Sequence, residues 1–261
     1  MRIVVKVGTS TLTHSTGRLN IRRVEALCKA LSDIKNAGHA LVLVSSGAIG
    51  MGVGKLKLRE RPQDMPGKQA AAAVGQCELM YVYDKLFSEY NHTAAQILLT
   101  GEDMRDPVRH QNFANTMLRL LDWQAIPVIN ENDTVATDEI AVGDNDTLSA
   151  LVAVSVQADL LILLSDIDGL YTADPHTHPE AQLVPRVETL TPEILAAAGG
   201  SGSALGTGGM ATKLSAARLC MEAGVDMAIV NGETPNILYD VIAGQQVGTR
   251  FIGRKNHAAD D

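Results

Sequence analysis

The chain of 261 residues lacks long apolar segments, paired cysteines and a linker rich in proline, glycine and serine between its halves. No stretch approaches the ~20 apolar residues of a membrane-spanning helix, and the apolar run in MRIVVKVGTS is too short for a signal peptide. Cys28, Cys77 and Cys220 lie far apart in helix-like segments and form no CxxC pair, which indicates reduced, buried thiols. We therefore expect a cytoplasmic protein built as one α/β domain.

The charge balance is acidic. With 22 basic and 30 acidic residues the formal net charge is −8. This argues against a general nucleic-acid or membrane-surface binder, which would need an excess of positive charge. A small group of lysines inside a cleft would not be visible in such a total.

The most polar stretch of the chain runs from 129 to 150, INENDTVATDEIAVGDNDTLSA. Its acidic residues are Glu131, Asp133, Asp138, Glu139, Asp144 and Asp146. The stretch joins an apolar strand-like run to an apolar helix-like run and is longer than that connection requires, which favours a functional loop. A solvated surface loop that ends in a helix N-cap is an equal alternative at this point.

Strand-sized and helix-sized segments alternate along the chain. We predict strands at 3–7, 40–44, 94–99, 126–129, 160–164, 226–230 and 249–252, and a pair of short strand-like runs between 176 and 190. We predict helices after the N-cap Asn20 and after Pro107, and at 68–90, 148–156, 191–198, 210–223 and 235–242. Residues 55–66 are predicted to be an exposed connection. Apolar faces mark the first two helices: Val24, Leu27, Cys28, Leu31 and Ile34 in the first, and Met117, Leu118 and Leu121 in the second. Because the strands are apolar throughout, they indicate a mostly parallel sheet covered on both faces. Ligands bind such sheets at the carboxyl ends of the strands.

Two lysines occupy positions suited to phosphate. Lys6 interrupts the first apolar strand, where an ammonium group must reach water or an anion. Lys213 lies in the first turn of the helix that follows the glycine-rich run 199–209, and free N–H groups at a helix start attract anions. The glycines and Lys213 have neither the GxxxxGK[ST] spacing of a P-loop nor the GxGxxG spacing of a dinucleotide-binding fold. The alternative to a phosphate site is therefore a glycine linker that precedes an ordinary helix lysine.

Six segments, taken in order, resemble one family. They are VKVGTS at the amino terminus, VSSGAIG from Val44, INEND from Ile129, VGDND from Val142, SDIDGLYTADP from Ser165 and GTGGMATK from Gly206. Together they are similar to the glutamate 5-kinase group of the amino acid kinase family, over residues 1–253. The resemblance implies an α/β fold, a three-layer αβα sandwich around a central, mostly parallel sheet. It implies an enzyme that uses ATP with Mg²⁺ to phosphorylate the side-chain carboxylate of glutamate for proline biosynthesis.

The resemblance also implies residue roles. Lys6 and Lys213 would stabilise the transferring phosphoryl group, and Asp146 would hold both lysines. Glutamate would contact Ser46, Gly47, Ala48, Asp133 and Asn145. ATP would contact Lys6, Gly8, Ser165, Asp166, Thr207, Gly208, Gly209, Met210, Ala211, Thr212 and Lys213, and Mg²⁺ would be carried by the ATP phosphates with no protein ligand assigned. Ser165 departs from the threonine expected there but keeps the hydroxyl.

The resemblance predicts one kinase domain over 1–254 and a homo-oligomer, either a dimer or a tetramer. From the sequence itself we expect the tail over 255–261 to be disordered. Many bacterial relatives continue into a module of the PUA type, and this chain ends before such a module. We expect no nucleic-acid or membrane partner. A carboxylate acceptor is already ionised at neutral pH, so no general base is needed, and none of the histidines lies in a motif. His176 and His178 form an HxH pair that could bind metal, although exposure to solvent is the simpler interpretation.

Two alternatives stay open. A kinase of the same fold could act on N-acetylglutamate, aspartate or UMP. Asp133 favours a free α-ammonium group over an acetylated nitrogen, because only the former carries a positive charge. A non-catalytic amino-acid sensor would not need the two lysines and Asp146.

Overall fold

The computed structural model describes residues 1–14, 18–136, 145–175, 177–197 and 209–254. Its strands are β1 (Arg2–Val7), β2 (Ala40–Val44), β3 (Ala94–Leu99), β4 (Ile126–Glu131), β5 (Leu160–Ser165), β6 (Arg186–Val187), β7 (Asp226–Asn231) and β8 (Thr249–Phe251). Its helices are α1 (Thr9–Leu12), α2 (Ile21–Asn36), α3 (Ala48–Leu56), α4 (Met65–Ser88), α5 (Gly101–Arg105), α6 (Pro107–Asp122), α7 (Asn145–Ser155), α8 (Pro192–Ala197), α9 (Met210–Glu222) and α10 (Ile237–Ile242). The predicted tail 255–261 lies outside the described residues.

The strands form one sheet in the order β3-β4-β2-β1-β5-β7-β8-β6. Neighbours are parallel except for β7 and β8, which are antiparallel. The mostly parallel sheet predicted from the apolar strands is therefore confirmed. Among the described residues 177–190, however, only Arg186–Val187 forms a strand, and Leu183 makes no more than an isolated bridge with Tyr171.

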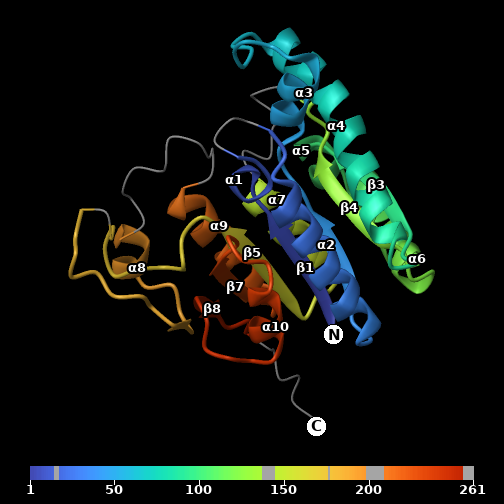
Figure 1. Ribbon diagram of the computed structural model, residues 1–261. Helices are drawn as coiled ribbons and strands as arrows, with labels where there is room; N and C mark the ends of the chain where they lie inside the picture. The colour runs from blue at the N-terminus through green and yellow to red at the C-terminus, as the bar shows by residue number, and fades with distance from the viewer. Residues whose placement is uncertain (15–17, 137–144, 176, 198–208, 255–261) are drawn as a thin grey trace.

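Apolar clusters cover both faces of the sheet. On one face, Val5 of β1 belongs to a cluster with buried residues of α2, α4 and α10, and Figure 1 shows α2 in front of β1. On the other face, Val4 belongs to a cluster with buried residues of α6, α7 and α9. Adjacent residues of one strand point to opposite faces, so a buried central strand must be apolar at every position. The arrangement is the predicted αβα sandwich.

The α2 segment follows the sequence prediction closely. The Asn20 side chain accepts a hydrogen bond from Arg23 N at 3.2 Å, as an N-cap does. All members of the predicted apolar stripe, Val24, Leu27, Cys28, Leu31 and Ile34, are buried. Gly38 follows the helix with φ +93°, the left-handed conformation that ends many helices.

Helix α3 was not predicted, because its sequence AIGMGVGKL contains three glycines, which disfavour helix. Close contact with α4 accounts for it. A Cβ on Gly52 would lie 1.8 Å from the Ala71 carbonyl oxygen, and one on Gly75 would lie 1.7 Å from that of Ala48. The two helices therefore pack backbone to backbone, and Figure 1 shows α3 and the start of α4 extending past the sheet. The exposed connection predicted over 55–66 is shortened to 57–64.

Three further predictions were wrong in detail. Leu118 was expected on the buried face of α6 with Met117 and Leu121, yet it is 38% exposed, because the face buried against the sheet carries the other two. Cys77 was expected to be buried but is exposed. It lies on the side of α4 opposite the buried face that includes Leu79 and Tyr83. Helix α7 also begins earlier than predicted, at Asn145.

Candidate active site

The carboxyl ends of the central strands meet at one edge of the sheet. Lys6 near the end of β1 pairs in register with Val44 of β2 and Leu163 of β5, and Val44 pairs with Ile129 of β4. The polar residues that end or follow these strands therefore lie at one level. The strand that follows β1 in the chain, β2, lies on one side of it, and the strand that follows β5, β6, lies on the opposite side, beyond β7 and β8. Such a switch point opens the crevice in which α/β sheets bind ligands.

Asp146 joins the two lysines at this crevice. Its Oδ1 is 2.7 Å from Lys6 Nζ, and its Oδ2 is 3.1 Å from Lys213 Nζ. The Thr212 hydroxyl also donates to Oδ2, at 3.1 Å. The side chains of Asp146, Lys6 and Lys213 are 1%, 12% and 8% exposed. Folding thus brings Lys6 and Lys213, which lie 140 and 67 positions from Asp146 in the chain, to the two oxygens of its carboxylate, as predicted.

The cluster carries a net positive charge. Burial by itself raises the pKa of the Asp146 carboxyl, but the charges of Lys6 and Lys213 outweigh burial and hold that pKa below its ordinary value. Asp146 also lies in the first turn of α7, where the helix dipole favours a negative charge. An ionised Asp146 and the two ammonium groups carry a summed charge of +1. That charge suits an anionic, transferring phosphoryl group.

The amino-terminal end of α9 adds to the positive electrostatic potential of the site. Helix α9 begins at Met210 after Gly209, and no side chain of the described residues caps it. Its first N–H groups are therefore available for an anion. Gly209, Met210, Ala211 and Thr212 of the predicted ATP set lie here, beside Lys213. Thr207 and Gly208, also predicted to bind ATP, lie outside the described residues.

Gly8 lies next to the first lysine of the cluster. A Cβ at Gly8 would be 3.6 Å from Lys6 Nζ. The space that a side chain would occupy is thus left open beside the ammonium group, as a bound phosphate requires.

The predicted acceptor residues Ser46 and Asn145 are in direct contact. Asn145 Nδ2 donates to Ser46 Oγ at 2.7 Å and to the Ser45 carbonyl at 2.9 Å. Because an amide nitrogen can only donate, Ser46 Oγ is the acceptor in this contact, and the Ser46 hydroxyl hydrogen stays available for another acceptor. Gly47, with φ +93°, turns the chain into α3, and Ala48 begins the helix. The turn faces the end of β1, since a Cβ on Gly47 would be 3.6 Å from the Thr9 methyl.

Asp133 lies apart from these contacts. In the described part of the chain no hydrogen bond or ion pair joins it to Ser46 or Asn145. Burial and the neighbouring Glu131 raise the pKa of Asp133 to about 6, and Arg61 opposes this weakly. A carboxylate held in this way gains most from a cationic partner such as an α-ammonium group. The neighbouring residues 137–144, which include Asp138, Glu139 and Asp144, lie outside the described residues.

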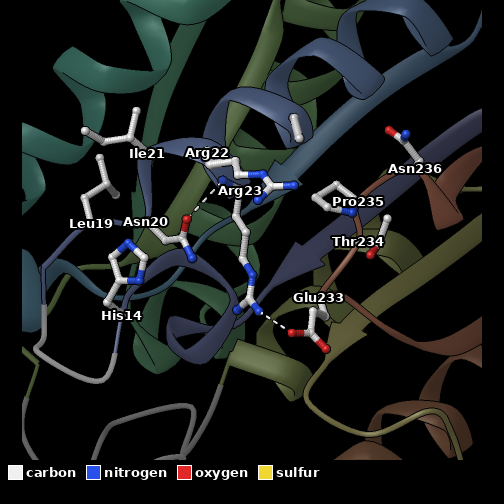
Figure 2. A pocket seen from close by; sticks show the side chains of 11 residues that line it. His14, Leu19, Asn20, Ile21, Arg22, Arg23, Glu233, Thr234, Pro235 and Asn236 are labelled. Carbon is white, nitrogen blue, oxygen red and sulfur yellow. Dashed lines mark hydrogen bonds and ion pairs between the residues drawn. The ribbon is translucent and has the colours of Figure 1, made fainter.

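Ser165, the last residue of β5, and Asp166, which follows it, were predicted to bind the nucleotide and line a cavity of about 220 Å³ at the sheet edge. Ser165 Oγ donates to Asp166 Oδ1 at 3.2 Å. Arg23 and Glu233 also line this cavity, and they form an ion pair at 2.9 Å that the sequence did not indicate. Figure 2 shows this pair on a second cavity, of about 650 Å³, around the start of α2. The larger cavity contains none of the predicted catalytic residues, so we assign the site by chemistry and not by size.

Two absences apply only to residues that the structure describes. Among them no group of three or more His, Cys, Asp and Glu side chains is arranged to hold a metal ion. His178 is exposed and pairs with Glu180 at 3.1 Å, while His176 lies outside the described residues. Likewise, no helix in the described ranges is both long and apolar enough to cross a bilayer.

Sequence reasoning missed two buried amides next to the acceptor residues. Asn130 Oδ1 lies 3.3 Å from Asn145 Nδ2, and Asn130 Nδ2 donates to Gln76 Oε1 at 2.9 Å. Asn130 is 2% exposed and Gln76 is 7% exposed. Asn130 carried a signal, since it lies in the polar stretch at the end of a strand. Gln76 carried none, because a glutamine in a helix is usually exposed.

The fold and the lysine pair define a class of protein. The family model described as "Amino acid kinase family" matches residues 1–231, and the chain belongs to that family.

The curated relatives carry a narrower name. A "Glutamate 5-kinase" of Clostridium tetani is 57% identical over 249 residues, which cover 95% of this chain and 93% of the relative. A protein of the same name from Clostridium perfringens is 52% identical over 258 residues, which cover 97% and 96%. Another from Caldanaerobacter subterraneus is 52% identical and covers 98% of this chain and 69% of its own length.

Solved structures agree in fold. Carbamate kinase from Giardia lamblia superposes with a TM-score of 0.67 at 18% sequence identity, and the match covers 97% of this chain and 98% of the Giardia chain. Isopentenyl phosphate kinase from T. acidophilum has a TM-score of 0.65 at 17% identity and covers 96% and 100%. At such identities the likeness concerns the fold, and it confirms the predicted class.

Proposed function

We propose that this chain transfers the γ-phosphoryl group of ATP to the side-chain carboxylate of L-glutamate, giving γ-glutamyl phosphate for proline biosynthesis. The names of the curated relatives, at 50–57% identity over nearly the whole chain, confirm the glutamate 5-kinase activity expected from the sequence. The observation that carries the mechanism is the pair of lysines held by one buried aspartate beside the Ser46–Asn145 contact.

We assign the chemistry as follows. An oxygen of the glutamate side-chain carboxylate attacks the γ-phosphorus, the new O–P bond forms, and the bond to the bridging oxygen of ADP breaks. The attacking carboxylate has a reference pKa of about 4.3 and needs no general base. Lys6 and Lys213 stabilise the charge on the moving phosphoryl group, while Asp146 keeps the two ammonium groups at fixed positions.

We assign glutamate to the end of β2 and the two ends of the acidic stretch. Ser46 has a hydroxyl hydrogen to give to a carboxylate, Asn145 fixes that hydroxyl, and the turn at Gly47 and Ala48 brings it to the strand edge. Asp133 is assigned to the α-ammonium group. This last role rests on the charge of Asp133 and on its position in the acidic stretch.

We assign ATP to the crevice between β5 and the start of α9. The uncapped N–H groups at Met210 and Ala211 and the open space beside Gly8 fit phosphate oxygens, and Ser165 and Asp166 fit the nucleotide side. Thr207 and Gly208 stay predictions. Mg²⁺, when bound, would neutralise charge on the ATP phosphates, which fits a site whose own residues supply cations.

Three wider assignments complete the proposal. Residues 1–254 are taken as one kinase domain, and the protein as a homo-oligomer, which light scattering at working concentration tests directly. We also propose a cytoplasmic location, as the wide spacing of Cys28, Cys77 and Cys220 in the sequence suggests.

The direct test is ADP release with Mg-ATP and a panel of acceptors: L-glutamate, N-acetylglutamate, L-aspartate and UMP. We expect the highest kcat/KM with L-glutamate. Best turnover with N-acetylglutamate or UMP contradicts the proposal, and binding of glutamate without ADP release identifies a sensor.

A further inference from the structure

Gln76 is a buried polar residue on α4 that the proposed reaction does not yet use. It is 7% exposed, and its Oε1 accepts a hydrogen bond from Asn130 Nδ2 at 2.9 Å. Its neighbour Gly75 is in backbone contact with Ala48 at the start of α3. The position of Gln76 is therefore fixed relative to the turn that carries Ser46.

The orientation of the Gln76 amide follows from the backbone. Asn130 Oδ1 accepts from Glu131 N at 2.9 Å, so Asn130 must turn its Nδ2 toward Gln76. Gln76 must then present its oxygen to Asn130, and its Nε2 faces elsewhere. Within the described residues, this buried Nε2 has no hydrogen-bond acceptor. An unmet buried donor is costly, so stability alone does not account for a glutamine here.

The same amide contacts lead to the acceptor site. Asn130 Oδ1 lies 3.3 Å from Asn145 Nδ2, which donates to Ser46 Oγ at 2.7 Å. Each amide in this row has its orientation set by its neighbour: Gln76 holds Asn130, Asn130 faces Asn145, and Asn145 leaves the Ser46 hydroxyl hydrogen free. Turning any one of them would break the pattern of donors and acceptors.

We propose that Gln76 is a positioning residue for the amino-acid substrate, which acts through Asn130 and Asn145 to aim the Ser46 hydroxyl at a carboxylate of the acceptor. The proposal rests on the glutamate kinase function given above. It assigns to α4, a helix outside the family-like motifs, a part in recognising the acceptor but not ATP.

The test is a comparison of Q76M, which keeps the shape and removes both polar atoms, with Q111M on the exposed surface of α6. For Q76M we expect the glutamate KM to rise roughly tenfold, the equivalent of one well-placed hydrogen bond, with the ATP KM and kcat within about twofold of wild type. Q111M should leave all three values unchanged. An unchanged glutamate KM in Q76M, or an equal loss for both substrates, overturns the proposal.

A double-mutant cycle separates positioning from a general loss of structure. If Gln76 acts through Asn130, Q76M adds little to the glutamate KM of N130A, whereas independent effects multiply. Independent effects would overturn the proposed route. If Q76M does not fold, Q76E replaces it, since it is close in shape and retains an acceptor for Asn130. A buried negative charge at this position repels glutamate, so we expect the glutamate KM of Q76E to rise at least as much as that expected for Q76M. An unchanged glutamate KM in Q76E contradicts the proposal. Wild-type turnover with glutamate in the same assay shows whether a negative result concerns Gln76 or the proposed function itself.

Discussion

Replacing Asp146 with asparagine removes the charge between the two lysines and leaves the side chain nearly the same size. The carboxylate is 1% exposed and lies 2.7 Å and 3.1 Å from the two ammonium groups. Removing one partner of a buried pair typically costs about 3–5 kcal/mol, because the remaining charge stays unpaired. Lys6 and Lys213 keep some exposure to solvent, so we expect the lower end, about 3 kcal/mol, or a Tm lower by roughly 6–12 °C.

Catalysis should suffer more than binding in D146N. The extra positive charge still attracts ATP, so the ATP KM should stay the same or fall. The lysines, however, are no longer held where charge develops, and comparable losses of one positioned stabilising group lower kcat by about 10²–10³-fold. Steady-state ADP release with glutamate and ATP varied in turn measures both effects.

The matched control is D226N. Asp226 pairs with Arg250 at 2.9 Å near the start of β7, away from the carboxyl edge, and both side chains are partly exposed. Loss of this ion pair should cost about 1 kcal/mol or less and leave kcat unchanged.

Because the folded-state pKa of Asp146 is lowered, its contribution to stability is present above the unfolded pKa of about 3.9 and is lost as the pH falls through the lowered value. The stability difference between wild type and D146N should thus narrow only below about pH 4. Wild-type kcat in D146N would refute the role given to this carboxylate.

Three further predictions concern single positions. K213A should lower kcat by about 10²-fold or more with the glutamate KM nearly unchanged, measured by steady-state kinetics, and unaltered turnover would remove Lys213 from the mechanism. Asp133 has a pKa of about 6, so kcat/KM for glutamate should fall as the pH drops through 6 and the carboxylate takes up a proton. In D133N, kcat/KM for glutamate should be low at every pH and should not show this fall. A D133N pH profile like that of the wild type speaks against the assignment. G47A should lower the free energy of unfolding by about 1 kcal/mol, because φ at Gly47 is +93°, and should raise the glutamate KM. The control G38A, at the same φ with open space around it, should lose similar stability but keep normal kinetics. Identical kinetics in both variants would count against a special role for the turn at Gly47.

The sheet and most helices could be predicted from the sequence, because burial and local capping dictate them residue by residue. A central strand covered on both faces must be apolar at each position, and Val4 and Val5 illustrate this. Asn20 before an apolar stripe marks the start of α2 without any knowledge of the rest of the chain. These signals are local, so a single sequence carries them.

Helix α3 could not be predicted, because its cause lies in another element. Its glycines lower helix propensity, yet Gly52 is where α4 approaches too closely for any side chain. Contact between helices thus overrides local preference. The same limit explains Cys77 and Leu118, whose exposure depends on which face of the helix is covered.

The site was predicted only in part. Lys6 and Lys213 could be singled out by their positions in a strand and at a helix start, but nothing in their spacing placed Asp146 between them; that came from resemblance to a family. Asn130 lay within the polar stretch for which a functional loop and a solvated surface loop were equal alternatives. Gln76 had no local signal, because its importance depends on an amide from β4 that folding brings to it.

The central claim is that the lysine pair moves a phosphoryl group onto a carboxylate, and trapping the product with hydroxylamine tests it most directly. An acyl phosphate reacts with hydroxylamine to give a stable hydroxamate and inorganic phosphate. With wild-type protein, Mg-ATP and L-glutamate, we predict γ-glutamyl hydroxamate in an amount equal to the ADP released. ADP formed without hydroxamate, under conditions in which authentic acyl phosphate is trapped, would contradict the account.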